Sequence, residues 1–106
     1  MMNTIDIILV TDPEIKRMNR RWFGKGSATD VIAFDLGQDS TPTGEVYISV
    51  DTAKRQAKER KVGWQDELLR LAVHGTAHVE GYDDLNLADF CKMREREWEL
   101  LLSLKP

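Results

Sequence analysis

Two histidines set four residues apart are the side chains in this sequence best suited to chemistry. His74 and His78 are the only histidines among the 106 residues, and Asp84 follows six positions after the second. On a helix this spacing places both imidazoles on one face, as helices do when they present two nitrogen ligands to a metal ion. Gly81 would then turn the chain so that the Asp84 carboxylate returns as a third ligand. Two nitrogens, one oxygen and an open position are typical of a catalytic divalent-metal site that activates water.

A purely structural explanation of these residues stays open. In that case His74 and His78 are half-buried side chains satisfied by hydrogen bonds, and Asp83 and Asp84 belong to a solvated turn. No general base can be assigned from the sequence, although Glu80 and Asp83 lie near the pair.

Other reactive or aromatic side chains are expected to have structural roles. We expect Cys91 to be a small core residue rather than a nucleophile. The three tryptophans Trp22, Trp64 and Trp98 are expected to anchor the core rather than stack on bases. The segment 24–26 lacks the spacing of a phosphate-binding loop and is expected to form a simple turn.

The charge of the chain is unevenly distributed. A net charge of −3 argues against non-specific coating of nucleic acid. Two short segments, 16–25 and 54–61, nevertheless hold ten of the fifteen lysines and arginines. Such clusters are usually solvated helix faces. The alternative is a local basic rim, in which Arg20, Arg21 and Lys25 are the candidates for contacting an anionic substrate.

The elements that must position these residues follow from local patterns. Apolar runs predict strands at 5–10, 29–36 and 45–50, the last two forming a hairpin around a polar loop at 37–43. A capping pattern at 11–14 predicts a first helix that ends near Trp22, and Asp51 is expected to cap the second. The longest helix should run from Trp64 to about Glu80. Its expected apolar stripe comprises Leu68, Leu69, Ala72, Val73 and Ala77.

A last helix is predicted after Asn86, which would cap it. We expect five of its side chains to pack inward: Leu87, Cys91, Trp98, Leu101 and Leu102.

The overall composition is that of one small globular domain. Hydrophobic residues make up 42% of the chain and charged residues 31%. No apolar run is long enough to cross a membrane, and no secretion signal precedes the first strand. The single cysteine excludes an internal disulfide and predicts a cytoplasmic, reducing location.

The segment His74-Gly75-Thr76-Ala77-His78-Val79-Glu80-Gly81-Tyr82-Asp83-Asp84 resembles the motif H-G-x-L-H-L-x-G-Y-D-H of the YbeY-type endoribonuclease family. The resemblance continues through most of the chain. Asn19 followed by Thr29-Asp30-Val31-Ile32-Ala33-Phe34 is similar to the family's N…T-D-V-[LI]-S-F. Residues 44–49 are similar to its G-D-[IL]-x-I-[SC] strand, and Met93 with Glu97 to its M-x-x-x-E.

The resemblance implies an α+β (mixed α/β) fold, with a mixed sheet, packed helices and a metal cleft at the end of a long central helix. It implies a metal-dependent, single-strand-specific endoribonuclease of rRNA maturation, acting at the small-subunit rRNA 3′ end, and of ribosome quality control. The ligands would be His74, His78 and Asp84, the metal zinc, and the partners rRNA and ribosome-associated proteins.

The sequence departs from the family pattern in three places. Asp84 replaces the third histidine, and a carboxylate there would also admit harder ions such as Mn²⁺. Phe23 stands where the family has an arginine. The whole chain, 1–106, reads as one domain that lacks the family's usual N-terminal strand and helix, so an uncovered sheet edge could drive self-association.

Two other functions remain as alternatives. The first is a non-catalytic module that binds RNA or the ribosome, with a structural metal or none. The second is a metallopeptidase, which would need a glutamate directly after the first histidine, where Gly75 stands.

Overall fold

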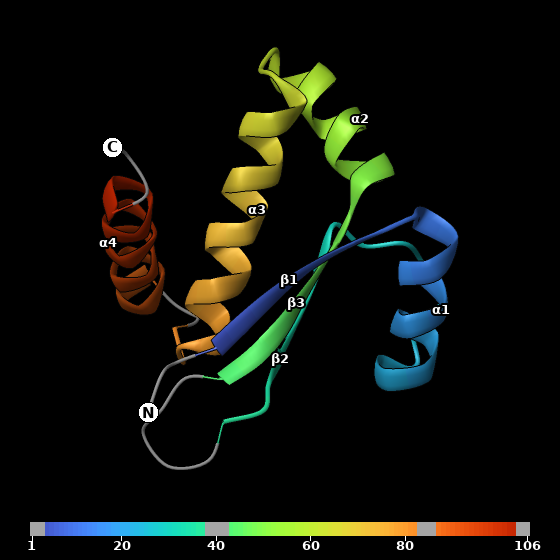
Figure 1. The fold of residues 1–106 in the computed structure, drawn as a ribbon, viewed down its shortest axis with the longest axis horizontal. Coiled ribbons are helices and arrows are strands. Elements are labelled where there is room, and N and C mark those ends of the chain that lie inside the picture. The colour runs from blue at the N-terminus through green and yellow to red at the C-terminus, as the bar shows by residue number, and fades with distance from the viewer. Residues whose placement is uncertain (1–3, 38–42, 83–86, 104–106) are drawn as a thin grey trace.

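The structure is a computed structural model, and it describes residues 4–37, 43–82 and 87–103. These ranges contain seven helices and strands. In chain order they are β1 Thr4–Val10, α1 Asp12–Phe23, β2 Val31–Asp35, β3 Thr43–Ser49, α2 Val50–Arg60, α3 Trp64–Val79 and α4 Leu87–Ser103 (Figure 1). No helix in these ranges is both long and apolar enough to cross a bilayer.

The three strands form one mixed sheet with β3 in the middle. β1 pairs with β3 in parallel, with Ile7 opposite Val46, and β2 pairs with β3 antiparallel, with Ala33 opposite the same valine. The antiparallel pairing confirms the predicted hairpin, and the mixed sheet with its helices confirms the α+β class. β2 is an edge strand, and among the described residues one of its sides pairs with no other strand.

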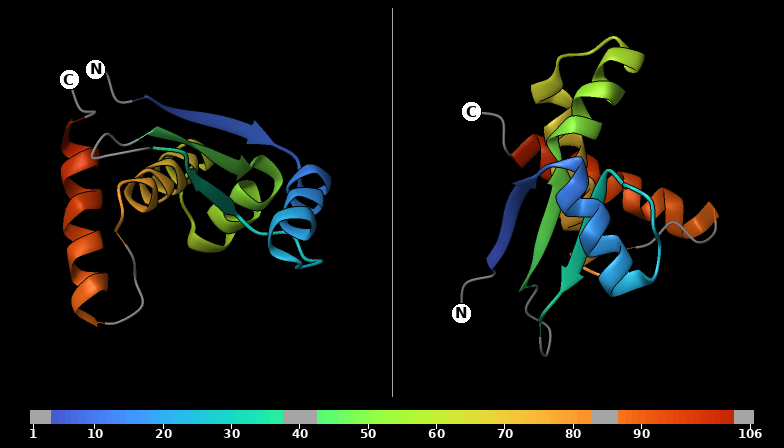
Figure 2. Two further views of the ribbon diagram at one scale, coloured as in Figure 1. Left: turned by 90° about the horizontal axis from the view of Figure 1, so that it is seen from below. Right: turned by 90° about the vertical axis from the view of Figure 1, so that its right-hand side faces the viewer.

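Alternation along the strands divides the core between the two faces of the sheet. Val46 and Ile48 point to one face, where they pack with Ala53 of α2 and with Leu71 of α3. The side chains that alternate with these along the strands point to the other face, where they pack with Ile15 of α1. The right-hand view of Figure 2 shows α1 in front of the strands and α3 behind them.

Local signals explain where α1 begins and ends. Thr11 and Glu14 form a capping box at its start, as the sequence predicts. The helix ends at Gly24, whose φ of 68° is a left-handed conformation that glycine adopts at little cost. The turn aims the following residues back toward β2.

The expectation that Asp51 caps the second helix is wrong. β3 continues directly into α2, so Ser49 is the cap and its Oγ accepts a hydrogen bond from the Thr52 N–H at 3.2 Å. Asp51 already lies in the first turn, where its carboxylate accepts from the Asp12 N–H at 2.9 Å.

The expected inward face of α4 is largely wrong. Cys91, Trp98 and Leu102 are exposed and Leu101 is only half-buried, whereas Met93 and Glu97 are buried. The reason is that α4 packs chiefly against α3 and stands away from the sheet (Figures 1 and 2). A single neighbouring helix covers only a narrow stripe of α4, whose buried residues are four positions apart. The side chain of Leu87 lies outside the description.

The expected core role of the tryptophans is wrong: Trp22 and Trp64 are exposed, like Trp98. Trp22 nevertheless contacts the sheet, since its ring meets that of Phe34 edge-on at 5.9 Å.

On α3 the expected apolar stripe is largely confirmed, because Val73 and Ala77 are buried and Leu68 and Ala72 pack against the core. The exceptions are Leu69, which is exposed, and Leu71, a large buried side chain outside the expected stripe. Asn86 and residues 38–42 of the predicted loop lie outside the described residues.

Candidate functional site

The helix that carries both histidines lies unusually close to the sheet. A Cβ added at Gly75 would come within 2.4 Å of Val46 Cγ1, and one added at Gly44 within 2.8 Å of Val79 Cγ1. Only glycine at these positions allows α3 and β3 to approach so closely. The glycine after the first histidine therefore has a packing role, and the close approach brings the last turns of α3 beside the edge strand β2.

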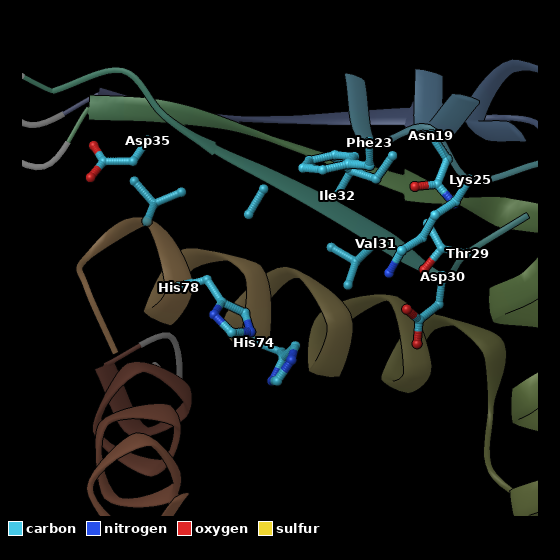
Figure 3. A pocket seen from close by; sticks show the side chains of 12 residues that line it. Asn19, Phe23, Lys25, Thr29, Asp30, Val31, Ile32, Asp35, His74 and His78 are labelled. Carbon is cyan, nitrogen blue, oxygen red and sulfur yellow. The ribbon is translucent and has the colours of Figure 1, made fainter. Parts of the chain in front are cut away.

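His74 and His78 project from one side of α3 into a pocket (Figure 3). Their ring centroids are 4.7 Å apart and the ring planes are nearly perpendicular, at 88°. Both residues are half-buried, so their nitrogens are sheltered and still reachable. The pocket has a volume of about 500 Å³. It runs along β2 and reaches the end of α1, and its other lining residues include Asn19, Phe23, Lys25, Asp30, Val31 and Asp35.

A buried carboxylate on α4 fixes the orientation of the first histidine. His74 Nδ1 lies 2.7 Å from Glu97 Oε2, and the other oxygen of Glu97 accepts from Arg94 at 2.7 Å. An ionised carboxylate has no proton to donate, so this hydrogen bond places the proton on Nδ1 of His74. The lone pair of His74 is consequently on Nε2, the nitrogen on the far side of the ring from Glu97.

This arrangement suits a metal ion. A histidine that donates its second N–H to a carboxylate is the usual state of a metal-ligating imidazole. Within the described ranges the His78 ring makes no hydrogen bond that would occupy its nitrogens. Rings this close can offer one nitrogen each to a shared ion at about 2.0–2.1 Å. A metal-ligand role for the two histidines therefore stays a prediction.

The predicted third ligand cannot be placed. Asp84 and Asp83 both lie outside the described residues, and the described part of the chain holds no group of three metal-ligating side chains. Glu80, considered above as a base, forms a two-pronged ion pair with Arg96 at 2.7 and 2.8 Å. The carboxylate of Glu80, followed by that of Glu99, raises the pKa of the Arg96 guanidinium above its ordinary value. Glu80 is therefore engaged with α4 rather than with the pocket.

The three predicted basic contacts separate into two places. Lys25 lines the histidine pocket, whereas Arg20 and Arg21 line a second hollow with Trp22, between α1 and the strands β1 and β3. The loop that carries Lys25 is held by buried Asn19, whose Nδ2 donates to the Ser27 carbonyl at 2.9 Å.

Sequence reasoning missed several residues of this pocket. Asp30, just before β2, and Asp35, the last residue of β2, add two carboxylates to the lining. Asp30 also accepts a hydrogen bond from Gln56 at 3.2 Å. The role of Glu97 was missed as well, although its place in the M-x-x-x-E pattern was a signal. Phe23 was noted only as a departure, and the structure places it in the pocket wall.

Comparisons with known proteins agree on one family. The family model described as Endoribonuclease YbeY matches residues 1–105. A protein of that name from Anaeromyxobacter sp. (strain Fw109-5) is 43% identical over 99 residues, which cover 91% of this chain and 52% of the relative. Another from Myxococcus xanthus is 40% identical over 103 residues, covering 92% of this chain and 35% of the relative. The chain thus spans about half or less of these two relatives.

A solved structure supports the same assignment. The solution structure of a protein from Thermotoga maritima is similar with a TM-score of 0.61 and 29% identity, covering 95% of this chain and 72% of the other. Sequence and fold are consistent with one another, and the chain belongs to the YbeY endoribonuclease family.

Proposed function

We propose that this chain is a metal-dependent endoribonuclease that cleaves single-stranded RNA in rRNA maturation, at the small-subunit rRNA 3′ end, and in ribosome quality control. The observation that carries the proposal is the His74–His78 pair, which faces a pocket while Glu97 fixes the first ring. Membership of the family, whose relatives bear the name endoribonuclease, supports RNA as the substrate.

In this proposal His74, His78 and Asp84 hold one divalent ion. Two imidazoles and a carboxylate suit zinc, and the carboxylate also admits Mn²⁺. Such an ion would supply Lewis-acid activation of a phosphodiester and of water. Glu97 contributes by keeping the proton on His74 Nδ1, so that Nε2 stays available as a ligand.

The remaining pocket residues bind the substrate in this proposal. Lys25 offers an ammonium group to a backbone phosphate, on a loop that Asn19 holds in place. Arg20 and Arg21 line the second hollow, where they would contact an RNA strand that extends beyond the histidine pocket. We further propose ribosome-associated protein partners and a cytoplasmic location, which the ribosomal RNA substrate requires.

The alternative of a non-catalytic ribosome- or RNA-binding module has specific observations in its favour. Asp84 stands in place of the family's third histidine, and Phe23 in place of its arginine. The metallopeptidase alternative is disfavoured by packing. A glutamate base at position 75 is impossible without moving α3, since even a Cβ there would collide with Val46.

Metal content and RNA cleavage of His74→Ala test the proposal together. The wild-type chain should bind about one divalent ion and should cleave single-stranded RNA after metal add-back. In this proposal two ligands of that ion, His74 and His78, are on α3. His74→Ala should lose both properties. Gln65→Ala, an exposed change near the start of α3, is the matched control and should keep both.

Two outcomes would contradict this function. Cleavage that persists in His74→Ala would show that the activity does not come from this site. Stoichiometric metal without turnover on any RNA would favour the binding module.

A further inference from the structure

One wall of the histidine pocket is an exposed aromatic ring. Phe23, the last residue of α1, is 51% exposed although it is a large apolar side chain. It lies on the side of β2 away from the histidines, near the loop that carries Lys25, so the pocket extends across the open edge of this strand (Figure 3).

The ring is backed by the sheet. Phe34 of β2 stacks on Phe23 with a centroid distance of 6.1 Å and an interplanar angle of 15°. Tyr47 and Trp22 meet Phe34 edge-on, at 5.9 Å each. Phe23 is therefore held against an ordered aromatic cluster. The Gly24 turn, with its N–H bonded to the Arg20 carbonyl at 3.1 Å, fixes the backbone just after it.

Phe23 differs from the other exposed rings in the described part of the chain by its place in the histidine pocket. Trp22, Trp64 and Phe90 each have a cation over the ring, from Arg21 at 5.4 Å, Lys54 at 5.5 Å and Arg94 at 4.9 Å. Neither these rings nor Trp98 line that pocket. Phe23 combines a free ring surface, a neighbouring cation and a place in the same pocket as His74.

A flat ring next to a lysine is the combination by which proteins hold single-stranded nucleic acid. Bases stack on the aromatic face regardless of their identity, and the cation follows the phosphate backbone. Bases inside an A-form duplex are stacked on each other and cannot reach such a ring.

We propose that Phe23 is a base-stacking residue for an unpaired nucleotide of the RNA substrate. The base lies on the exposed part of the ring, the adjoining phosphate meets Lys25, and the strand continues across the edge of β2 toward His74 and His78. This inference deepens the proposed endoribonuclease function and rests on it. Phe23 thereby selects for single strands at the position where the family has an arginine.

Binding of a fluorescently labelled single-stranded oligoribonucleotide, measured by anisotropy with a chelator present, tests the proposal. Phe23→Leu keeps an apolar side chain against Phe34 but lacks a π-face, and should weaken binding by about 5- to 100-fold. Phe23→Trp should restore binding. Trp64→Leu removes another exposed ring, one outside the pocket, and should bind as the wild type does.

Salt dependence separates stacking from charge. Phe23→Leu should leave the slope of log Kd against log salt unchanged, whereas Lys25→Ala should reduce it by about 0.7. The wild-type chain should prefer the single strand to the matching duplex, and Phe23→Leu should lose most of that preference. Circular dichroism of each variant shows whether the fold is kept.

Binding by Phe23→Leu within about twofold of wild type would overturn the proposal. So would failure of Phe23→Trp to restore binding in a folded protein, or an equal loss for the duplex. Because a chelator prevents metal-dependent cleavage, these results do not depend on turnover. A chain that never cleaves RNA but binds through Phe23 would refute the proposed activity and leave the stacking role intact.

Discussion

His74 and Glu97 are 23 positions apart in the sequence and 2.7 Å apart in space. The carboxylate is buried, but it accepts from both His74 and Arg94, and these charge-assisted hydrogen bonds offset the cost of removing it from water. The pair determines which nitrogen of His74 can act as a ligand. Glu97 is therefore a positioning residue in the proposed site.

Replacing Glu97 by glutamine tests this positioning role. Glutamine keeps the size but loses the charge that holds the proton on Nδ1, so the affinity for Zn²⁺ should fall by about 10- to 100-fold. Metal titration by calorimetry measures the affinity, and nitrogen NMR of the metal-free protein reports the His74 tautomer.

Glu95→Gln is the matched control for this change, since Glu95 is an exposed glutamate on the same helix. It should leave both measurements unchanged. An unaltered tautomer and an unaltered affinity in Glu97→Gln would show that the contact is only structural.

The sequence predicted the histidine pair well because the helical repeat alone places residues four apart on one face. It could not predict that Glu97 meets Nδ1 of His74, since that depends on how α4 packs on α3. Phe23 illustrates the same limit. Its identity was visible as a departure from a family pattern, but its place in the pocket depends on the Gly24 turn and on Phe34.

Among the elements, α3 is positioned by two glycines that let it contact β3. Gly75 faces Val46, and Gly44 faces Val79. Local helix propensity argues against glycine in the middle of a helix, at a cost of about 1 kcal/mol relative to alanine. The tertiary contact outweighs that propensity here.

Gly75→Ala should therefore destabilise the protein despite improving helix propensity. The new methyl group would overlap Val46 Cγ1, and overpacking of this kind costs typically about 1–3 kcal/mol. Urea denaturation followed by circular dichroism measures the change in the free energy of unfolding.

Gly26→Ala is the control for this substitution. An added Cβ there would meet only Arg20 Nη2, at 3.7 Å. If Gly75→Ala were as stable as Gly26→Ala, the close approach of α3 to β3 would not be required for stability.

The starts of α1 and α2 are joined by one carboxylate. Asp12 accepts hydrogen bonds from Ser49 at 2.5 Å, from Thr52 at 2.6 Å and from Arg55 at 2.7 Å. The bonds from Ser49 and Thr52, followed by Arg55, lower the pKa of Asp12 from its ordinary 3.8 to about 2. The lowered pKa means that the folded state favours the ionised carboxylate.

This lowered pKa predicts a pH dependence of stability. A carboxylate whose pKa is lower in the folded state stabilises the fold above its unfolded pKa, and that contribution is lost as the pH falls through the folded pKa. Stability should thus decline between about pH 4 and pH 2, with Asp12 contributing on the order of 1–2 kcal/mol.

Thermal unfolding across this pH range, compared with Asp12→Asn, measures the contribution. The variant should be less stable at neutral pH and should lose less stability on acidification. Asp66→Asn, at an exposed aspartate in the first turn of α3, serves as the control. An acid dependence in Asp12→Asn equal to that of the wild type would rule out this cause.

At the scale of the whole molecule, most boundaries of the helices and strands followed from local patterns, but the assembly did not. The β2–β3 hairpin was predictable because its strands are neighbours in sequence. The parallel pairing of β1 with β3 joins segments separated by a helix and a strand, and no local signal specifies it. The exposure of Trp98 and Cys91 follows from the position of α4 outside the sheet, which also depends on non-local packing.

Self-association through β1 stays a prediction. β1 is an edge strand, and Ile7 and Leu9 on it are exposed within the described part of the chain. Light scattering should show a mass that rises with protein concentration, because unpaired edges and apolar side chains favour pairing between copies.

A lysine on the edge strand should prevent this pairing, so Leu9→Lys is expected to remain monomeric. Leu36→Lys changes an equally exposed leucine after β2 and should associate as the wild type does. A monomer mass independent of concentration in the wild type would count against the prediction.

The hydrogen bond between Glu97 and His74 also links the site to the cohesion of the molecule. α4 packs chiefly against α3, and this bond is one of its buried attachments there. Any ligand that binds the ordered His74 ring is linked to that docking, and adds about 2.7 kcal/mol of folding stability at a hundred times its Kd. Binding of a ligand to His74 should therefore also stabilise the packing of α4 on α3. Slower amide hydrogen exchange along α4 would then report that the site is filled, without any measurement of turnover.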